Sequence, residues 1–488
     1  MADLPLELLE GVFLRLGPLD RLSAARTCRR WAEIMCEPKW LEAVQFVIPG
    51  PEAKEAALAF RQSPRQYRYL SVTGGNLHTF DRGFWNAVNE KIRDLRIIQC
   101  KWSFRRLCDI LGLCRDIESL QLLTEETLEL LRSLMPGLAS ISLTSSLDTR
   151  SRAFSGALAG LLNSGQRLIE LDLNLRHLSD ADVIGVLRKH SESVEWLRLG
   201  GCHSLQRETY TAIGGCRKLR RLSLLGATRF DDAHLRQLSL TAPDLEHLSI
   251  GGSSSISKTG LNRIFKYGKL RRLALEHNRI VASSLTSLGN LSDLRHLYLV
   301  GVFCDARVFR DIASLKELQS LILASGAISS GCFGLMVGNL SKLEMLDVGS
   351  CEVLTDEDGI KFSRLKKLKY LRIRRAPNFT AAAFERGLGS SAMASLAFEK
   401  CSLDDDALVS IAEHHPSLTG FMVHECGKIG DQGLKNFLLH QPNLKGLTVH
   451  HCKSLTSQIV SEIEISFPRL SYTVELGIEE DCIVDVIN

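Results

Sequence analysis

The strongest constraint on the fold of this chain is a sequence repeat of about 25 residues that covers most of its length. The template is L-x-x-L-x-L-x-x-C, followed by a polar turn and an amphipathic stretch. Clear copies are "VEWLRLGGC" at 194–202, "LEMLDVGSC" at 343–351 and "LKGLTVHHC" at 444–452. From 168 to 470, successive copies start 24 to 26 residues apart. One such unit cannot bury its apolar face alone, so the repeat predicts a stack of units.

Each unit is predicted to be a strand, a turn and a helix. Apolar residues at the fourth and sixth positions alternate with polar ones, which is the period of a half-buried strand. Proline precedes several copies, as in "HPSL" at 415–418, where it ends a helix and begins an extended segment. Between strand and helix, the Asp and Thr residues of "LTDED" at 354–358 suit a helix N-cap. The fold class is therefore α/β, with a parallel sheet on one side and helices on the other.

The pattern resembles the cysteine-containing leucine-rich repeat over residues 67–478. That family forms a horseshoe with a parallel sheet on its concave side and helices on its convex side. The resemblance implies about 16–17 units and a large surface that binds proteins. Residues 46–66 are expected to be a helical linker, and residues 479–488 a C-terminal cap.

Residues 1–45 do not follow the repeat and read as two or three short helices. If residues 6–16 form a helix, the polar residues and Gly11 share one sector and roughly 220° of the surface is apolar. A helix packed on a single core needs a much narrower apolar stripe. About forty residues rarely fold without a metal, a disulfide or a partner. The surplus apolar surface is therefore expected to dock on another molecule.

The same segment resembles the F-box in the order of its motifs: "LPLE" at 4–7, a helix with Phe13, "LGP" at 16–18, "CRRW" at 28–31 and a late Trp40. Two mild departures are Thr27 and the Lys39-Trp40 pair. The resemblance implies a three-helix module that binds a Skp-family adaptor and, through it, a cullin scaffold. Leu4, Pro5 and Leu9 are expected to point outward, and Trp31 to pack on the first repeat. The residues expected to contact the adaptor are Leu4, Pro5, Leu8, Leu9, Val12, Phe13, Leu16 and Leu19. The alternative is that the segment only caps the solenoid.

Composition and motifs exclude several classes of function. A net charge of +4 on 488 residues argues against a general nucleic-acid binder. The sequence contains no run of 18 apolar residues, so no membrane span is expected. Fourteen cysteines without a signal peptide indicate reduced thiols in the cytoplasm or nucleus. Cysteine shares the ninth repeat position with Ala, Ser, Asn and Gly, which predicts a small buried side chain. No P-loop, G-x-S-x-G, H-E-x-x-H or C-x2-C motif occurs, so no enzyme activity, cofactor or metal is expected.

The open face of the sheet is the candidate site for a protein substrate. Strand positions five and seven should face it. The strand "YLRIRR" at 370–375 places two arginines there, and arginine suits bidentate binding of carboxylate or phosphate. His450 is expected to face the concave side and His451 to point away from it. The candidate substrate-binding residues are Tyr298, Arg372, Arg374, Glu399, His424 and His450. The alternatives are an ordinary solvated polar face, or partner contact through the loops or the C-terminal cap.

Taken together, the two resemblances imply the substrate-recognition subunit of a Skp–cullin–F-box (SCF) ubiquitin ligase. Such a subunit is not catalytic and binds target proteins, here acidic or phosphorylated ones, for ubiquitination. One alternative is a scaffold or an inhibitor made of leucine-rich repeats without a ligase. A further alternative is a receptor for a small ligand that uses a basic pocket for a polyanionic cofactor, as in plant hormone-sensing F-box proteins.

Overall fold

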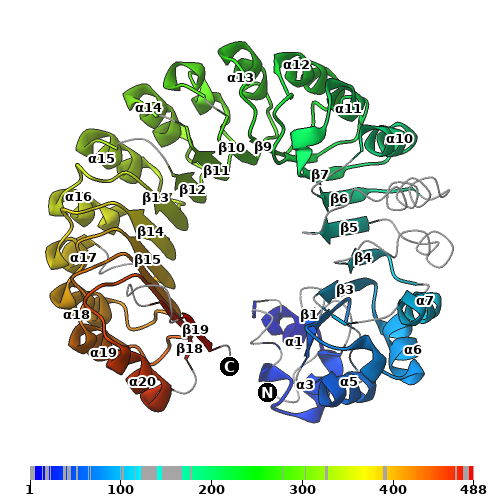
Figure 1. Cartoon of the computed structure of the whole chain (residues 1–488), viewed down its shortest axis with the longest axis horizontal. Coiled ribbons are helices and arrows are strands. Elements are labelled where there is room, and N and C mark those ends of the chain that lie inside the picture. The colour runs from blue at the N-terminus through cyan, green and yellow to red at the C-terminus, as the bar shows by residue number, and fades with distance from the viewer. Residues whose placement is uncertain are drawn as a thin grey trace. The chain divides into compact units, whose positions relative to one another are not determined.

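The computed structural model divides into two compact units, Met1–Ser223 and Leu224–Asn488, and both are built from strands that alternate with helices (Figure 1). The structure describes residues 6–13, 15–16, 21, 23–36, 40, 45–50, 53–63, 65, 67–98, 100–101, 104–114, 116–122, 140–145, 167–175, 179–278, 280–302, 304–324, 328–387, 393–467, 470–475 and 483–486.

The first unit opens with a small helical module. Its helices α1 (Leu6–Phe13) and α3 (Arg29–Ile34) share one hydrophobic cluster. The segment between the two helices and Trp40 also contribute to it. The buried members of this cluster are Leu9, Phe13, Ala24, Ala25, Ile34, Met35 and Trp40, and Leu16 and Trp31 pack against it half-buried. Among the described residues, this cluster draws only on residues 9–40. The module therefore has a core of its own.

The segment expected to be a helical linker contains a strand as well as a helix. β1 (Gln45–Pro49) pairs in parallel with β2 (Tyr69–Thr73), and α5 (Ala53–Gln62) lies between them in sequence. Phe46 and Phe60 meet with ring centroids 5.2 Å apart, and Phe60 also contacts Phe84 at 5.7 Å. These contacts give residues 45–62 the construction of a solenoid unit: a strand in the sheet and a helix behind it.

The rest of the first unit continues the parallel sheet from β2 to β7. Its further elements are η1 (Leu77–Thr79), α6 (Arg82–Lys91), β3 (Asp94–Ile98), α7 (Phe104–Leu113), β4 (Ser119–Leu122), β5 (Ser140–Ser145), β6 (Glu170–Leu175), α10 (Asp180–His190), β7 (Trp196–Gly200), η2 (Cys202–Ser204) and α11 (Arg207–Ile213). The strand β8 (Arg221–Leu224) runs across the boundary at which the second unit begins.

The second unit carries parallel strands from β9 to β18, and β19 is antiparallel to β18. The strands are β9 (His247–Gly251), β10 (Arg272–Glu276), β11 (His296–Val300), β12 (Ser320–Leu323), β13 (Met345–Val348), β14 (Tyr370–Arg374), β15 (Ser395–Glu399), β16 (Gly420–His424), β17 (Gly446–His450), β18 (Ser471–Glu475) and β19 (Ile483–Val486). The helices are α12 (Asp232–Thr241), α13 (Lys258–Ile264), η3 (Ala282–Ser284), η4 (Leu288–Asn290), α14 (Ala306–Ser314), α15 (Ser330–Asn339), α16 (Asp356–Ile360), η5 (Lys361–Arg364), α17 (Ala381–Gly387), α18 (Asp405–His414), α19 (Asp431–Leu439) and α20 (Ser457–Ser466).

In each unit the helices cover one face of the sheet and leave the other face open (Figure 1). The alternating strand pattern buries the apolar residues at the fourth and sixth repeat positions, such as Leu371 and Ile373, against the helices. This arrangement confirms the α/β leucine-rich-repeat solenoid expected from the repeat. The open face is where side chains are available to a partner.

Aspartates after the strands cap helices and also form hydrogen bonds to the next repeat. The side chain of Asp404 accepts a hydrogen bond from the Ala407 amide, as the N-cap expectation requires. The next residue, Asp405, accepts a hydrogen bond of 2.7 Å from the amide of Gly430 in the following repeat. Asp431 repeats this contact with the amide of Thr456 at 2.8 Å. The sequence pattern predicted the caps. It did not predict the hydrogen bonds between repeats, because these depend on how consecutive repeats stack.

In several repeats the ninth position holds a side chain that donates to a backbone carbonyl. The thiols of Cys202 and Cys401 donate to carbonyls at 3.2 and 3.6 Å. Asn278 fills the same position, donates to the Ile250 carbonyl at 2.7 Å and accepts from the Ser253 amide at 2.7 Å. A small side chain fits because the chain turns sharply here. This outcome agrees with the structural role expected for the repeat cysteines.

Burial predicts that the repeat cysteines resist alkylation. It raises the pKa of the Cys351 and Cys426 thiols to about 12, and the thiolate is the reactive form. We expect iodoacetamide at pH 8 to modify the partly exposed Cys28, Cys36 and Cys332 in the folded chain, and the buried repeat cysteines only after denaturation. Mass spectrometry of tryptic peptides would measure this. Rapid modification of Cys426 in the folded chain would contradict the packing described here.

Candidate functional site

The helical module at the start of the chain closes its core around Phe13. The Phe13 ring lies edge-on to Trp31 and Trp40, with centroid distances of 5.1 and 6.0 Å. Arg21 donates from Nε to the Phe13 carbonyl at 2.9 Å, and its guanidinium lies 5.4 Å from the Trp40 ring centre. Together these contacts join α1 to the rest of the module. Trp31, expected to pack on the first repeat, lies in this cluster instead.

The structure separates the expected adaptor contacts into buried and exposed residues. Leu9 was expected to point outward, but it is 1% exposed because it lies one helical turn from Phe13 and completes the same stripe. Phe13 is also buried, and Leu16 is half-buried. Val12, at 48% exposed, remains open on α1. The expectation for Leu4, Pro5, Leu19 and the side chain of Leu8 lies outside the described residues.

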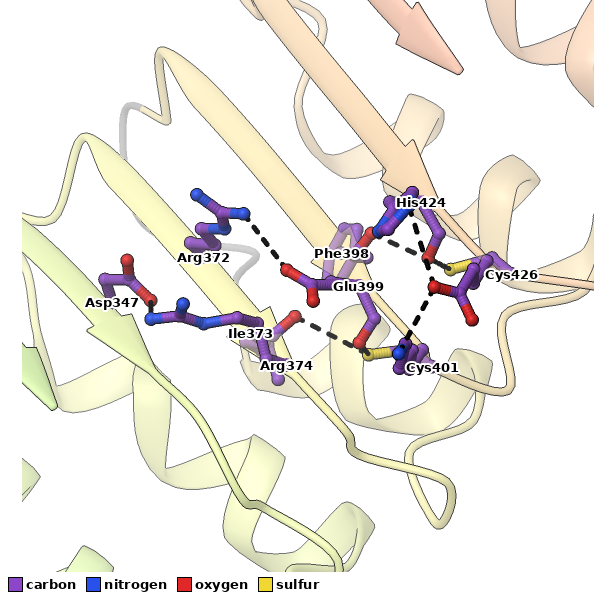
Figure 2. Close-up of polar contacts among 11 residues, drawn as sticks. Asp347, Arg372, Ile373, Arg374, Phe398, Glu399, Cys401, His424 and Cys426 are labelled. Carbon is purple, nitrogen blue, oxygen red and sulfur yellow. Dashed lines mark hydrogen bonds and ion pairs between the residues drawn. The ribbon is translucent and has the colours of Figure 1, made fainter. Parts of the chain in front are cut away.

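The second candidate surface is the open face of β13–β17, where an acidic and basic network lies (Figure 2). Arg374 donates from Nη2 to Oδ1 of Asp347 at 2.6 Å, and Arg372 donates from Nη2 to Oε2 of Glu399 at 3.0 Å. Both pairs run diagonally between neighbouring strands. We call Asp347, Arg372, Arg374 and Glu399 the charge ladder. It includes Asp347, which was not among the candidates chosen from the sequence.

The charge ladder is more deeply buried at one end than at the other. The side chains of Asp347 and Arg374 are 10% and 20% exposed, whereas those of Arg372 and Glu399 are 40% and 25% exposed. Burial raises the pKa of Asp347, and the charges of Arg374 and Arg372 act against that rise. The Nε groups of both arginines are buried without a hydrogen-bond partner. The arginines are therefore held in place by carboxylates while part of their donor capacity is unused.

Three histidines meet next to the charge ladder. The His424 ring lies 6.0 Å from the His450 ring and 5.6 Å from the His451 ring. His451 was expected to point away from His450, but their centroids are only 6.5 Å apart. The left-handed backbone of His451, with φ of 52°, interrupts the alternation of the strand. Nε2 of His424 lies 3.6 Å from Glu425, which also pairs with Lys400 at 3.2 Å.

Tyr298 lies apart from the other candidates. Tyr298 on β11 lies opposite Ile322 on β12, which lies opposite Asp347 on β13. Two strand spacings, about 10 Å, therefore separate Tyr298 from the charge ladder. The guanidinium carbon of Arg272 lies 4.7 Å from its ring centre, and its hydroxyl accepts from Ser320 at 3.3 Å. The structure thus brings Arg372, Arg374, Glu399 and the histidines together, but not Tyr298.

Neither a metal site nor a membrane-spanning helix occurs among the described residues. In the described part of the chain, no group of three or more His, Cys, Asp or Glu side chains has an arrangement that would hold a metal ion. Among the helices described in the structure, none has the length and apolar character needed to span a membrane.

Comparisons with known proteins identify relatives for both parts of the chain. Residues 1–41 match the model of the F-box-like family. The chain is 26% identical over 294 residues to F-box/LRR-repeat protein 4 of Bos taurus, a match covering 58% of this chain and 43% of that protein. It is 25% identical over 191 residues to antagonist of mitotic exit network protein 1 of Saccharomyces cerevisiae, covering 37% and 30%. The chain spans less than half the length of these curated relatives. Among solved structures, the yeast Rad7 and Elc1 complex aligns over 65% of this chain and 83% of that one, with 17% identity and a TM-score of 0.44.

Proposed function

Because the chain is an F-box protein with leucine-rich repeats, we propose that it is the substrate-recognition subunit of an SCF-type ubiquitin ligase. In this role the F-box binds a Skp-family adaptor, the adaptor joins a cullin scaffold, and the open sheet face holds a protein substrate. The subunit raises the effective concentration of the substrate near the ubiquitin-loaded enzyme, so none of its residues need do chemistry. Such a complex works in the cytoplasm or nucleus.

The observation that carries the proposal is the helical module, which has its own core and still leaves an apolar side chain on its surface. Leu9 and Phe13 support α1 from beneath, Leu16 packs half-buried against the same core, and Val12 is exposed. We assign the adaptor contact to this surface, together with Leu4, Pro5, Leu8 and Leu19.

The charge ladder supports the proposal that the substrate is recognised through an acidic or phosphorylated segment. A carboxylate or phosphate needs donors that are already oriented, and Arg372 and Arg374 are fixed by Glu399 and Asp347. The anion would bind the remaining guanidinium N–H groups of the more exposed Arg372, because the unused Nε groups of both arginines are buried. His424 and His450 border the same face and add further donors.

The test compares two exposed apolar residues of the first unit, Val12 in the F-box and Leu58 on α5, which are 48% and 53% exposed. We expect the wild-type chain to form a one-to-one complex with a Skp-family adaptor on co-expression. A glutamate within an apolar interface is costly, so Val12→Glu should weaken the complex at least about tenfold.

The matched variant Leu58→Glu should bind the adaptor like wild type. Size-exclusion chromatography with light scattering and a titration of the adaptor measure both effects, with circular dichroism as the check on folding. Failure of the wild-type chain to bind any Skp-family adaptor would favour the scaffold or inhibitor alternative. Equal binding by Val12→Glu and wild type would overturn the assigned surface.

A further inference from the structure

The first unit contains a hollow on the open face of its sheet that the proposed function does not use. Its volume is about 490 Å³, and side chains from β2 to β7 line it. The middle of the hollow is made by Ser119 and Gln121 on β4 and by Ser140 and Ser142 on β5. The lining residues of the strands at the two ends are larger and include Tyr69 on β2 and Trp196 on β7. We call this feature the N-terminal hollow.

Carboxylates outnumber cations in the lining of the N-terminal hollow. The lining includes four acidic residues, Asp94, Glu118, Glu170 and Asp172, and two arginines, Arg68 and Arg96. The whole chain, by contrast, has a net charge of +4. The lining itself therefore has two more carboxylates than cations, and two further arginines, Arg198 and Arg221, lie beside it.

Some of these charges are already neutralised by partners within the first unit. Arg68 lies 3.4 Å from Glu118, and Arg198 lies 3.7 Å from Asp172. Glu170 accepts a hydrogen bond of 3.0 Å from the Ser140 hydroxyl, but none of the described residues forms an ion pair with it. A partly buried carboxylate without a cation is unfavourable, so Glu170 would gain from a positively charged ligand.

A tryptophan on the neighbouring strand lines the same hollow as this carboxylate. Trp196 is the partner of Glu170 in the register between β6 and β7. The ring already attracts one guanidinium, since the central carbon of Arg221 lies 6.0 Å from its centre. A cation between Glu170 and Trp196 would combine an ion pair with a cation–π contact. Asp172 follows two residues later on the same face. Burial raises its pKa and the charge of Arg198 acts against that rise, so a second cation nearby would favour the charged form further.

We propose that the N-terminal hollow binds the arginine or lysine side chains of an extended basic peptide segment. The size of the hollow favours a peptide over a small amine. Six strands from β2 to β7 span about 24 Å, which matches about seven residues of extended chain. Glu170, Asp172 and Trp196 hold the cation, and Ser140 and Ser142 leave the space that its side chain enters. That the peptide belongs to a ubiquitination substrate rests on the proposed function, whereas the binding itself does not.

The test uses the full-length chain without adaptor and fluorescein-labelled octa-arginine as the probe. We expect fluorescence anisotropy at physiological salt to detect binding of octa-arginine and none of octa-glutamate. The double variant Glu170→Gln/Asp172→Asn should weaken octa-arginine binding at least about tenfold, since it removes the carboxylates and keeps their shape. Trp196→Leu should weaken it about threefold through loss of the cation–π contact.

The matched control is Glu192→Gln/Glu208→Gln, which makes the same change of net charge at exposed positions of the same unit. It should bind octa-arginine like wild type. Equal weakening by both double variants would mean that attraction is non-specific, and this result, like absence of octa-arginine binding, would overturn the inference. Because no adaptor is present, neither outcome depends on the ligase proposal, which the Val12→Glu experiment tests separately.

Discussion

Replacing Phe13 with alanine should unfold the F-box and abolish adaptor binding while the solenoid stays folded. Phe13 has no exposed surface and contacts Trp31 and Trp40, so its loss removes the centre of a small core. Phe→Ala at a buried site typically costs about 3–5 kcal/mol of unfolding free energy. A module of about forty residues has little more stability than that to lose. Hydrogen exchange measured by mass spectrometry should show loss of protection in α1 and α3, with unchanged protection in β14–β17.

The control for this prediction is Val12→Ala, one residue away on the same helix. Val12 is half-exposed, so this variant should change module stability by less than about 0.5 kcal/mol and still weaken adaptor binding. The pair therefore separates folding of the F-box from contact with its partner. Retained protection of α3 in Phe13→Ala would show that the module does not depend on the core described here.

The repeat made most of the solenoid predictable because strand alternation is a local property. Leu371 and Ile373 are buried, and Arg372 and Arg374 lie on the open face, as the period of two requires. The strand at 45–49 was missed because its sequence, "QFVIP", lacks the leucine template. It belongs to the sheet through its pairing with β2, which no local pattern reveals.

For the candidate sites, the sequence indicated which face of a strand or helix is involved, but not which side chains on that face contact one another. Leu9 was expected outside because the sequence shows that α1 has an excess of apolar surface, but not which apolar residues its own core uses. The pairs of the charge ladder are diagonal, so they depend on side-chain conformations that residue spacing does not give. A signal for Asp347 existed, because it occupies the same repeat position as Arg372 one strand earlier.

Removing Arg374 should destabilise the second unit in a manner that depends on pH. Arg374 compensates Asp347, whose side chain is only 10% exposed. Arg374→Ala leaves this carboxylate buried without its ion-pair partner, which typically costs about 3–5 kcal/mol of unfolding free energy at neutral pH. By contrast, Arg372→Ala breaks a more exposed pair and should cost about 1 kcal/mol or less. Urea unfolding followed by circular dichroism measures both variants.

The direction of the pH dependence follows from Asp347. Burial already raises its pKa above the unfolded value, and loss of Arg374, whose charge lowers that pKa, raises it further. A carboxyl whose folded pKa exceeds its unfolded pKa penalises folding at high pH, and the penalty fades as pH falls through the folded value toward the unfolded one. The stability difference between wild type and Arg374→Ala should therefore shrink from pH 7 to pH 4. In the Asp347→Asn background, Arg374→Ala should cost less at pH 7 and show little of this trend. A cost that is independent of pH and equal to that of Arg372→Ala would mean that Asp347 does not need Arg374, and the charge ladder would then be a set of separate surface charges.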